Sequence, residues 1–147
     1  MITEVTVSRH TVADDLRPAV LRLARELRHE TERLGVTARQ ATLLWLIRNT
    51  PGLSLRELAD LERISPPALS GHVDRLERAG LVERLRSSSD RRRVGLRLTP
   101  AGEQLQRRIR ARRTTWLADR LEWLSQEELE AVSAAVPALR RIVDGVS

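Results

Sequence analysis

The sequence predicts a mainly α-helical fold that carries one small β-hairpin. Apolar residues recur every three or four positions through most of the chain, as they do along one face of a helix. Aromatic residues make up only 2% of the chain, so Leu, Val and Ala have to fill the interior, a composition that favours helices. The hairpin is predicted from residues 81–98, where apolar and charged residues alternate on both sides of a polar loop.

The first predicted helix covers residues 14–34. Pro18 fits only near the beginning of a helix, where its missing N–H has no intrahelical partner to lose, so this helix is expected to begin only a few residues before Pro18. Gly35 ends the segment. A heptad-like apolar stripe is formed by Leu16, Val20, Leu23, Leu27 and Leu34.

Two capping signals predict the next two helices. Thr37 and Gln40 have the spacing of a capping box and begin a helix that Pro51 stops. Ser54 and Glu57 repeat that spacing at the beginning of a short helix. The buried side of this short helix is expected to contain Leu55, Leu58, Ala59 and Leu61.

A fourth helix begins after Ser65, which is a favourable N-cap followed by Pro66 at the first helical position. It runs to Ala79, and Gly80 ends it as a left-handed cap. Together with the preceding short helix it forms a helix-turn-helix. Its buried stripe is expected to be Leu69, Val73 and Leu76, which leaves Pro67, Gly71, Asp74, Arg75 and Arg78 pointing away.

Two strands, residues 81–85 and 94–98, follow the helix-turn-helix. The loop between them carries Arg91, Arg92 and Arg93 consecutively, with Asp90 at its entrance. Three adjacent guanidinium groups gain little unless they meet an anion, and DNA is the leading candidate. A fifth helix is expected from Thr99 to about residue 124. Ser125 and Glu128 then cap a sixth helix, which Pro137 is expected to kink.

Composition narrows the class of protein. The 147 residues suit a single domain, and the net charge of +6, carried entirely by Arg with no Lys, favours a polyanionic partner. Without Cys there is no thiol chemistry, and His10, His29 and His72 lack the spacing of metal ligands. No cofactor or enzyme motif is recognised. No signal peptide and no apolar run of about 18 residues is present, so we expect a soluble cytoplasmic protein without membrane contact.

These residues resemble the MarR family of bacterial transcriptional regulators over nearly the whole chain. The resemblance rests on LSLRELADLERISPPALSGHVDRLERAGLVER and on the wing signature Asp90-x-Arg92 with Leu96-x-Leu98-Thr99 and Gly102. It implies a winged helix-turn-helix core at residues 37–99, flanked by dimerisation helices at 11–35 and 100–147. It also implies a homodimer on pseudo-palindromic operator DNA, with repression as the family's commoner mode.

The resemblance implies a set of DNA-contacting residues. Arg92 should reach the minor groove, oriented by Asp90, while Arg91 and Arg93 attract phosphates. His72 either donates to DNA or packs structurally, and Gly71 and His72 depart from the commoner family pattern. The full expected DNA-binding set is Ser65, Pro67, Ser70, Gly71, His72, Arg75, Arg86, Asp90, Arg91, Arg92 and Arg93.

Apolar stripes in the first and last helices are the candidates for the dimer interface, with burial inside one subunit as the alternative. They comprise Leu16, Val20, Leu23, Leu129, Val132, Val136, Leu139 and Val143. Many relatives respond to a small aromatic or anionic effector held between the dimerisation helices and the winged helix. Trp45, Trp116 and His29 are candidates for contacting such an effector, but their expected role is core packing. The alternative to a specific regulator is a winged-helix module that coats DNA non-specifically or binds protein partners.

Overall fold

The computed structural model of the chain describes residues 6–86 and 94–145. Helices dominate these residues, and a single antiparallel pair of strands completes the fold, so the predicted fold class is confirmed. In chain order the elements are α1 (Arg9–Glu32), α2 (Ala38–Asn49), α3 (Leu55–Glu62), α4 (Pro66–Arg78), β1 (Val82–Arg86), β2 (Val94–Leu98), α5 (Pro100–Leu121) and α6 (Gln126–Asp144).

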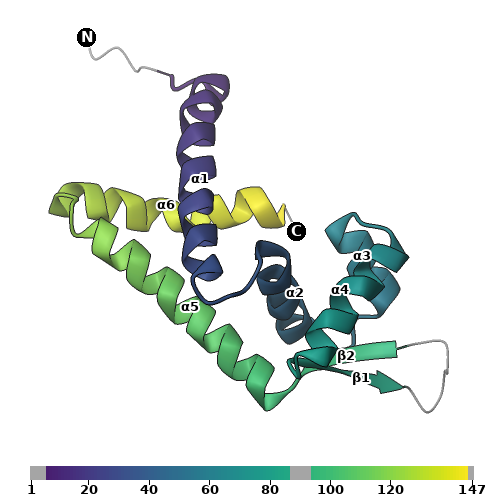
Figure 1. Ribbon diagram of the computed structural model, residues 1–147. Helices are drawn as coiled ribbons and strands as arrows, with labels where there is room; N and C mark the ends of the chain where they lie inside the picture. Colours follow the sequence, from purple (N-terminus) through teal and green to yellow (C-terminus); the bar gives the residue numbers. More distant parts are fainter. Residues whose placement is uncertain (1–5, 87–93, 146–147) are drawn as a thin grey trace, which may run out of the picture.

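The elements form a compact lobe and a set of long helices. Figure 1 shows α2, α3, α4 and the hairpin gathered at one end of the molecule. From there α5 runs away from the hairpin towards α6, and α1 packs against it on the way. No helix in the described ranges is both long and apolar enough to cross a lipid bilayer.

The hydrophobic core lies in the compact lobe. Leu43, Leu44, Leu58, Leu69 and Leu76 are completely buried there, and the core extends to the hairpin and to one residue of α5. The described part of α6 contains no buried residue. The chain therefore has one core, and its last helix contributes nothing to it.

The predicted caps are present. Thr37 with Gln40, and Ser125 with Glu128, form complete capping boxes at α2 and α6. The Ser54, Ser65 and Thr99 hydroxyls each accept a hydrogen bond from a backbone N–H in the first turn of α3, α4 and α5. A hydroxyl at this position satisfies a donor that the helix itself cannot, which is why such local signals fix where a helix begins.

Two expectations about helices were wrong. Pro18 lies well inside α1, because the helix already begins at Arg9. Proline has no N–H and so removes one intrahelical hydrogen bond, but α1 continues through this position without a break. Leu61 of α3 is 56% exposed rather than buried, because α3 packs through Leu58 and Ala59, and Leu61 lies about 110° around the helix from the middle of that pair.

The hairpin joins the compact lobe to α5 through a close contact. Val82 pairs with Leu98 and Arg86 with Val94, so β1 begins and ends one residue later than predicted. In the first turn of α5, a Cβ added at Gly102 would lie 2.0 Å from the carbonyl oxygen of Leu81, the residue before β1. Only glycine allows this approach, which gives a physical reason for Gly102 in the sequence signature.

Candidate nucleic-acid interface

A tight turn sets the direction of α4. Arg63 adopts a left-handed conformation (φ 54°) at the end of α3, and the N–H of Ile64 reaches back to the carbonyl of Ala59 at 3.1 Å. This is the hydrogen-bond pattern of a Schellman cap. Ser65 then begins α4 immediately, so the two helices stay in contact across a turn of only a few residues.

The outward face of α4 is unusual for a solvent-exposed helix. Leu69, Val73 and Leu76 are fully buried on the other side, and the outward stripe consists of Pro67, Gly71, Asp74 and Arg78. At Gly71 the backbone is not left-handed, and an added Cβ would meet no atom within 4 Å. Nothing within the described chain therefore requires glycine at this position.

The predicted residues of α4 and its N-cap are all at least partly accessible to solvent. Ser65, Pro67 and Arg75 are exposed, while Ser70, Gly71 and His72 are half-buried on the same helix. Arg86 is exposed at the end of β1, where it pairs with Val94. Four predicted residues of the hairpin tip lie outside the described residues: Asp90, Arg91, Arg92 and Arg93.

Arg84, which is not among the residues predicted from the sequence, links the hairpin to α4. Its Nη2 donates to Asp74 Oδ1 at 2.6 Å, and its Nε lies 4.0 Å from Glu77 Oε2. Arg84 and Asp74 lie on different elements, so helical spacing cannot reveal the pair. The sequence contains one indication that Asp74 has a cationic partner: its carboxylate lies in the middle of a face that is expected to meet a polyanion.

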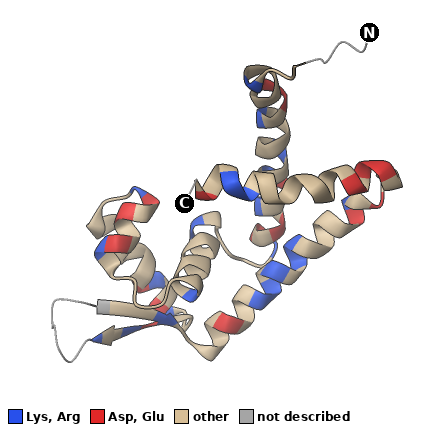
Figure 2. Ribbon diagram, turned by 180° about the vertical axis from the view of Figure 1, so that it is seen from behind, with Lys and Arg blue, Asp and Glu red and all other residues tan. Residues whose placement is uncertain are grey.

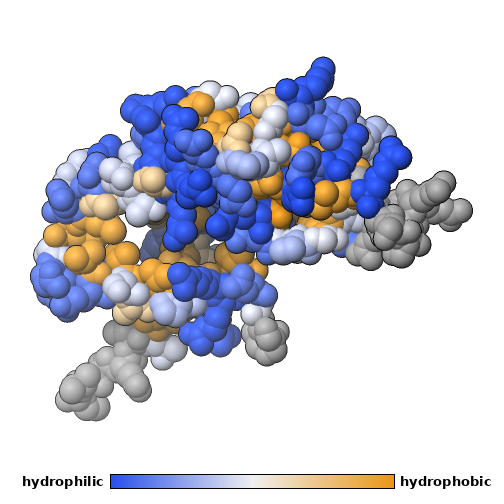
Figure 3. Space-filling view, turned by 90° about the horizontal axis from the view of Figure 1, so that it is seen from below, coloured by the Kyte–Doolittle hydropathy of each residue, from blue (hydrophilic) through white to orange (hydrophobic). Residues whose placement is uncertain are grey.

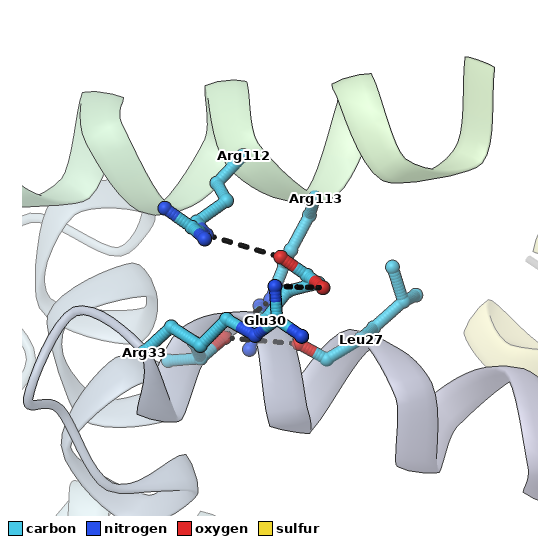
Figure 4. A network of polar contacts seen from close by, with 6 residues as sticks. Leu27, Glu30, Arg33, Arg112 and Arg113 are labelled. Carbon is cyan, nitrogen blue, oxygen red and sulfur yellow. Dashed lines mark hydrogen bonds and ion pairs between the residues drawn. The ribbon is translucent and has the colours of Figure 1, made fainter. Parts of the chain in front are cut away.

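A polar network holds α1 against α5, as Figure 4 shows. Arg112 Nε donates to Glu30 Oε2 at 3.0 Å, and Arg33 lies 3.7 Å from the same carboxylate. Arg113 Nε donates to Thr31 Oγ1 at 2.9 Å. Burial lowers the pKa of Arg113, because desolvation disfavours the charged guanidinium. The network ties the last turn of α1 to the second half of α5.

Arginine side chains also follow the outside of α5, where Figure 2 shows a run of basic residues. Arg107, Arg108 and Arg110 are exposed, whereas Arg112 and Arg113 make the contacts with α1. The exposed arginines give this part of α5 a positive surface.

A cavity of about 420 Å³ lies between α2 and α5. Trp45, Gln106, Arg110 and Arg113 are among its lining residues. Trp45 is 53% exposed, so its expected role in core packing was wrong. The reason is that α2 buries Leu43, Leu44 and Ile47 instead, which leaves the indole at the rim of this cavity.

The other two residues considered for core packing also lie outside the core. His29 is exposed, and Trp116 is half-buried. The Arg120 guanidinium lies 4.9 Å from the ring centre of Trp116 and 4.6 Å from that of Trp123. Both distances are within the range of cation–π contacts. The two indoles therefore pack against Arg120, near the junction of α5 and α6.

Apolar side chains on α1 and α6 remain uncovered in the single chain. Of the expected dimerisation residues, Leu16 and Leu129 are half-buried. The others are exposed, by fractions from 37% at Val136 to 83% at Val143. Figure 3 shows apolar residues along the hollow that separates α6 from the rest of the molecule. The complete exposed set is Val20, Leu23, Val132, Val136, Leu139 and Val143.

Comparisons with known proteins show which family this chain resembles. A sequence model of the MarR family matches residues 36–94. An uncharacterized HTH-type transcriptional regulator of Mycobacterium bovis is 31% identical over 133 residues, which cover 90% of this chain and 93% of that protein.

Solved structures share the fold. RV1404 of Mycobacterium tuberculosis superimposes with a TM-score of 0.83 at 26% identity, covering 97% of this chain and 99% of that one. FabT of Streptococcus pneumoniae, solved in complex with DNA, gives a TM-score of 0.69 at 18% identity over 89% of this chain and 96% of its own.

The described residues contain no cluster of three or more His, Cys, Asp or Glu side chains that could hold a metal ion.

Three findings indicate the same class of protein. They are the helix-turn-helix followed by a hairpin, the match to the family model, and the Mycobacterium bovis relative that aligns with 90% of this chain. The chain belongs to the MarR family of DNA-binding transcriptional regulators, and it is a regulator rather than an enzyme.

Proposed function

We propose that the protein is a homodimeric, sequence-specific repressor acting in the bacterial cytoplasm. In this proposal α4 enters the major groove of a pseudo-palindromic operator, and the hairpin tip reaches the adjacent minor groove. The observation that carries it is the outward face of α4. The residues proposed to contact bases and phosphates lie on this face, on its flanks and at the N-cap of α4. They are Ser65, Pro67, Ser70, His72 and Arg75.

Gly71 supports the major-groove assignment. A glycine inside a helix costs about 1 kcal/mol relative to alanine, and neither backbone conformation nor packing in the described chain requires it. A surface that approaches the helix more closely than a Cβ allows would offset that cost. The floor of a DNA groove is such a surface.

The hairpin supplies the proposed minor-groove contact. Arg86 lies at the end of β1, and the segment 87–93 continues from its pair with Val94. Within that segment Arg92 is proposed to enter the minor groove with Asp90 orienting it. Arg91 and Arg93 are proposed to neutralise phosphates, because clustered guanidinium groups release counterions from DNA.

The dimer is proposed from the uncovered stripes of α1 and α6. A helix with no buried residue and a continuous apolar stripe gains little stability in a monomer, because its stripe remains in water. A second copy related by a two-fold axis would cover both stripes. It would also place two α4 helices about one DNA turn apart, roughly 34 Å.

Selection from a random-sequence pool of duplexes tests the proposal. A specific regulator is expected to enrich a palindrome with half-sites one turn apart. Uniform enrichment would indicate the DNA-coating alternative, and no retention of DNA would indicate a module for protein partners.

The wing assignment has its own test. Arg92→Ala is expected to weaken binding of the selected duplex by roughly 1–3 kcal/mol without dissociating the dimer. Arg107→Ala, an exposed arginine on α5, is the matched control and should bind normally. Normal binding by a dimeric Arg92→Ala variant would contradict the role given to the wing.

Release by a small aromatic or anionic effector is the second part of the proposal, and the cavity between α2 and α5 favours it. Arg113 is half-buried at this cavity, and no carboxylate of the described residues forms an ion pair with it. The Trp45 indole offers a flat face at the rim.

Benzoate is a suitable probe of this cavity. It should quench the fluorescence of the wild-type protein more than that of Trp45→Phe, and it should release the selected duplex from the wild-type protein. Equal quenching of both proteins would rule out this cavity.

A further inference from the structure

Two carboxylates lie on the part of α4 that is proposed to meet DNA. Asp74 falls in the outward stripe between Gly71 and Arg78, one helical turn from each, and Glu77 flanks it. A carboxylate facing a phosphate backbone repels it, and the repulsion strengthens as water leaves the contact. The stripe therefore carries an unfavourable charge where the proposed function needs a favourable one.

Arg84 places its guanidinium on these carboxylates from a different element. It donates to Asp74 at 2.6 Å and lies 4.0 Å from Glu77. Side chains two residues apart in a strand point to the same face, so Arg84 shares a face with Val82, which is buried in the core. The strand therefore holds Arg84 over the flank of α4 without requiring the side chain itself to be buried.

The charges on α4 show what Arg84 adds. Within the helix, Asp74 and Glu77 balance Arg75 and Arg78, so α4 has no net charge while His72 is neutral. Arg84 makes the combined surface positive. Its side chain is 33% exposed and that of Asp74 is 49% exposed, and an ion pair this accessible contributes little to the stability of the fold. The ion pair of Arg84 with Asp74 therefore contributes more to the charge that a bound anion meets than to the stability of the fold.

We propose that Arg84 is a positioning residue for DNA binding: it neutralises Asp74 and Glu77, so that Arg75 and Arg78 meet phosphates without an opposing charge. This inference rests on the proposed DNA-binding function. Two other roles predict different results. Arg84 could contact DNA itself, or Asp74 could accept a hydrogen bond from a cytosine amino group.

The test measures affinity by fluorescence anisotropy, with a duplex that the wild-type dimer selects from a random pool. Arg84→Ala is expected to weaken binding about three- to ten-fold, the size typical of a charge at the rim of an interface. The loss should shrink as salt is raised, because salt screens exposed charges. The triple variant Asp74→Asn/Glu77→Gln/Arg84→Ala should regain most of the affinity, since no carboxylate remains to be neutralised.

Arg48→Ala is the matched control. Arg48 pairs with Glu103 at 2.9 Å between α2 and α5, with a comparable exposure and no contact with α4. Its loss should leave DNA affinity unchanged. Thermal unfolding of every variant identifies any change that comes from misfolding.

Each contrary result overturns the inference in a recognisable way. Unchanged affinity of Arg84→Ala means that the carboxylates do not oppose DNA. A triple variant as weak as Arg84→Ala means that Arg84 contacts DNA directly, and a changed base preference in Asp74→Asn alone means that Asp74 reads a base. Failure of the wild type to bind any duplex removes the proposed function itself, an outcome distinct from the other three.

Discussion

Arg112 of α5 donates from Nε to Glu30 Oε2 of α1 at 3.0 Å, and so joins residues that are 82 positions apart in the chain. The Glu30 side chain is only 11% exposed, and its second cation, Arg33, is more distant. A carboxylate this enclosed depends on its partners, because burial penalises a charge that is not paired.

Arg112→Ala is therefore expected to lower the free energy of unfolding by about 1–3 kcal/mol, the cost of leaving a buried polar group unsatisfied. Urea denaturation followed by circular dichroism measures the change. Arg108→Ala, on an exposed position of the same helix, is the control and should be close to neutral. Equal stability of the two variants would show that Glu30 is adequately solvated or held by Arg33 alone.

The neighbouring Arg113 is expected to behave differently. Burial lowers the pKa of this guanidinium, and its Nε donates to a neutral hydroxyl on Thr31. Folding therefore works against its charge at neutral pH, and the penalty is relieved only as the pH rises through the lowered pKa of the folded state. Arg113→Met should cost less than about 1 kcal/mol, because an apolar chain of similar length replaces a desolvated cation. A loss in urea denaturation as large as that of Arg112→Ala would contradict this reasoning.

Two glycines provide a matched pair of opposite predictions. Gly71→Ala should raise the free energy of unfolding by about 0.5–1 kcal/mol, because alanine is the better helix former and open space surrounds the position. Gly102→Ala should destabilise the protein, because its Cβ would collide with the Leu81 carbonyl. Thermal unfolding decides both.

DNA affinity gives the Gly71 comparison a second readout. If α4 meets DNA as proposed, the more stable Gly71→Ala variant should bind the selected duplex less tightly. Greater stability with unchanged affinity would mean that no surface approaches the helix at this point.

Arg63 is the only residue other than glycine with a positive φ in the described ranges. A left-handed conformation costs an L-residue with a Cβ roughly 1–2 kcal/mol, whereas glycine adopts it freely. Arg63→Gly is thus expected to stabilise the protein by up to about 1 kcal/mol. Arg56→Gly, at an exposed position within α3, is the control and should destabilise it by a similar amount. A lower melting temperature for Arg63→Gly would indicate that the arginine side chain makes a stabilising contact.

Val136→Glu tests the proposed dimer. The substitution places a charge in the uncovered stripe of α6, so it should abolish dimerisation, with sedimentation velocity reporting a monomer or an unfolded chain. Ala134→Glu lies about 160° away around the helix from Val136 and should remain dimeric. A dimeric Val136→Glu variant would exclude this stripe from the interface.

Local signals in the sequence predicted most of the fold. Ser65 and Thr37 were identifiable as caps because a capping hydroxyl acts on a backbone N–H within its own first turn. The buried stripe of α4 was equally predictable, since three residues at helical spacing face one core. Leu61 and Trp45 were mispredicted because their exposure depends on which neighbouring helix covers them, and that is set by tertiary contacts.

The candidate interface was predicted only in part, for a related reason. The outward face of α4 follows from helical geometry, but Arg84 reaches Asp74 from a strand, and no periodicity links a strand to a helix. The assignment of Asp90 and Arg92 stays a prediction from the resemblance, as does the role of His72. Of these three assignments, the DNA affinity of the Arg92→Ala variant tests the one made for Arg92.

The close contact of Gly102 with Leu81 makes α5 a lever. One end of this 22-residue helix is fixed to the hairpin with no space for a side chain, and its other half is held to α1 by Arg112 and Arg113. A helix of this length spans about 33 Å, so a tilt of about 5° at one end moves the other by about 3 Å. That displacement is close to the rise of a single base pair, about 3.4 Å. A small tilt of α5 at its α1 end would therefore displace the end next to the hairpin by a distance comparable with one base-pair step.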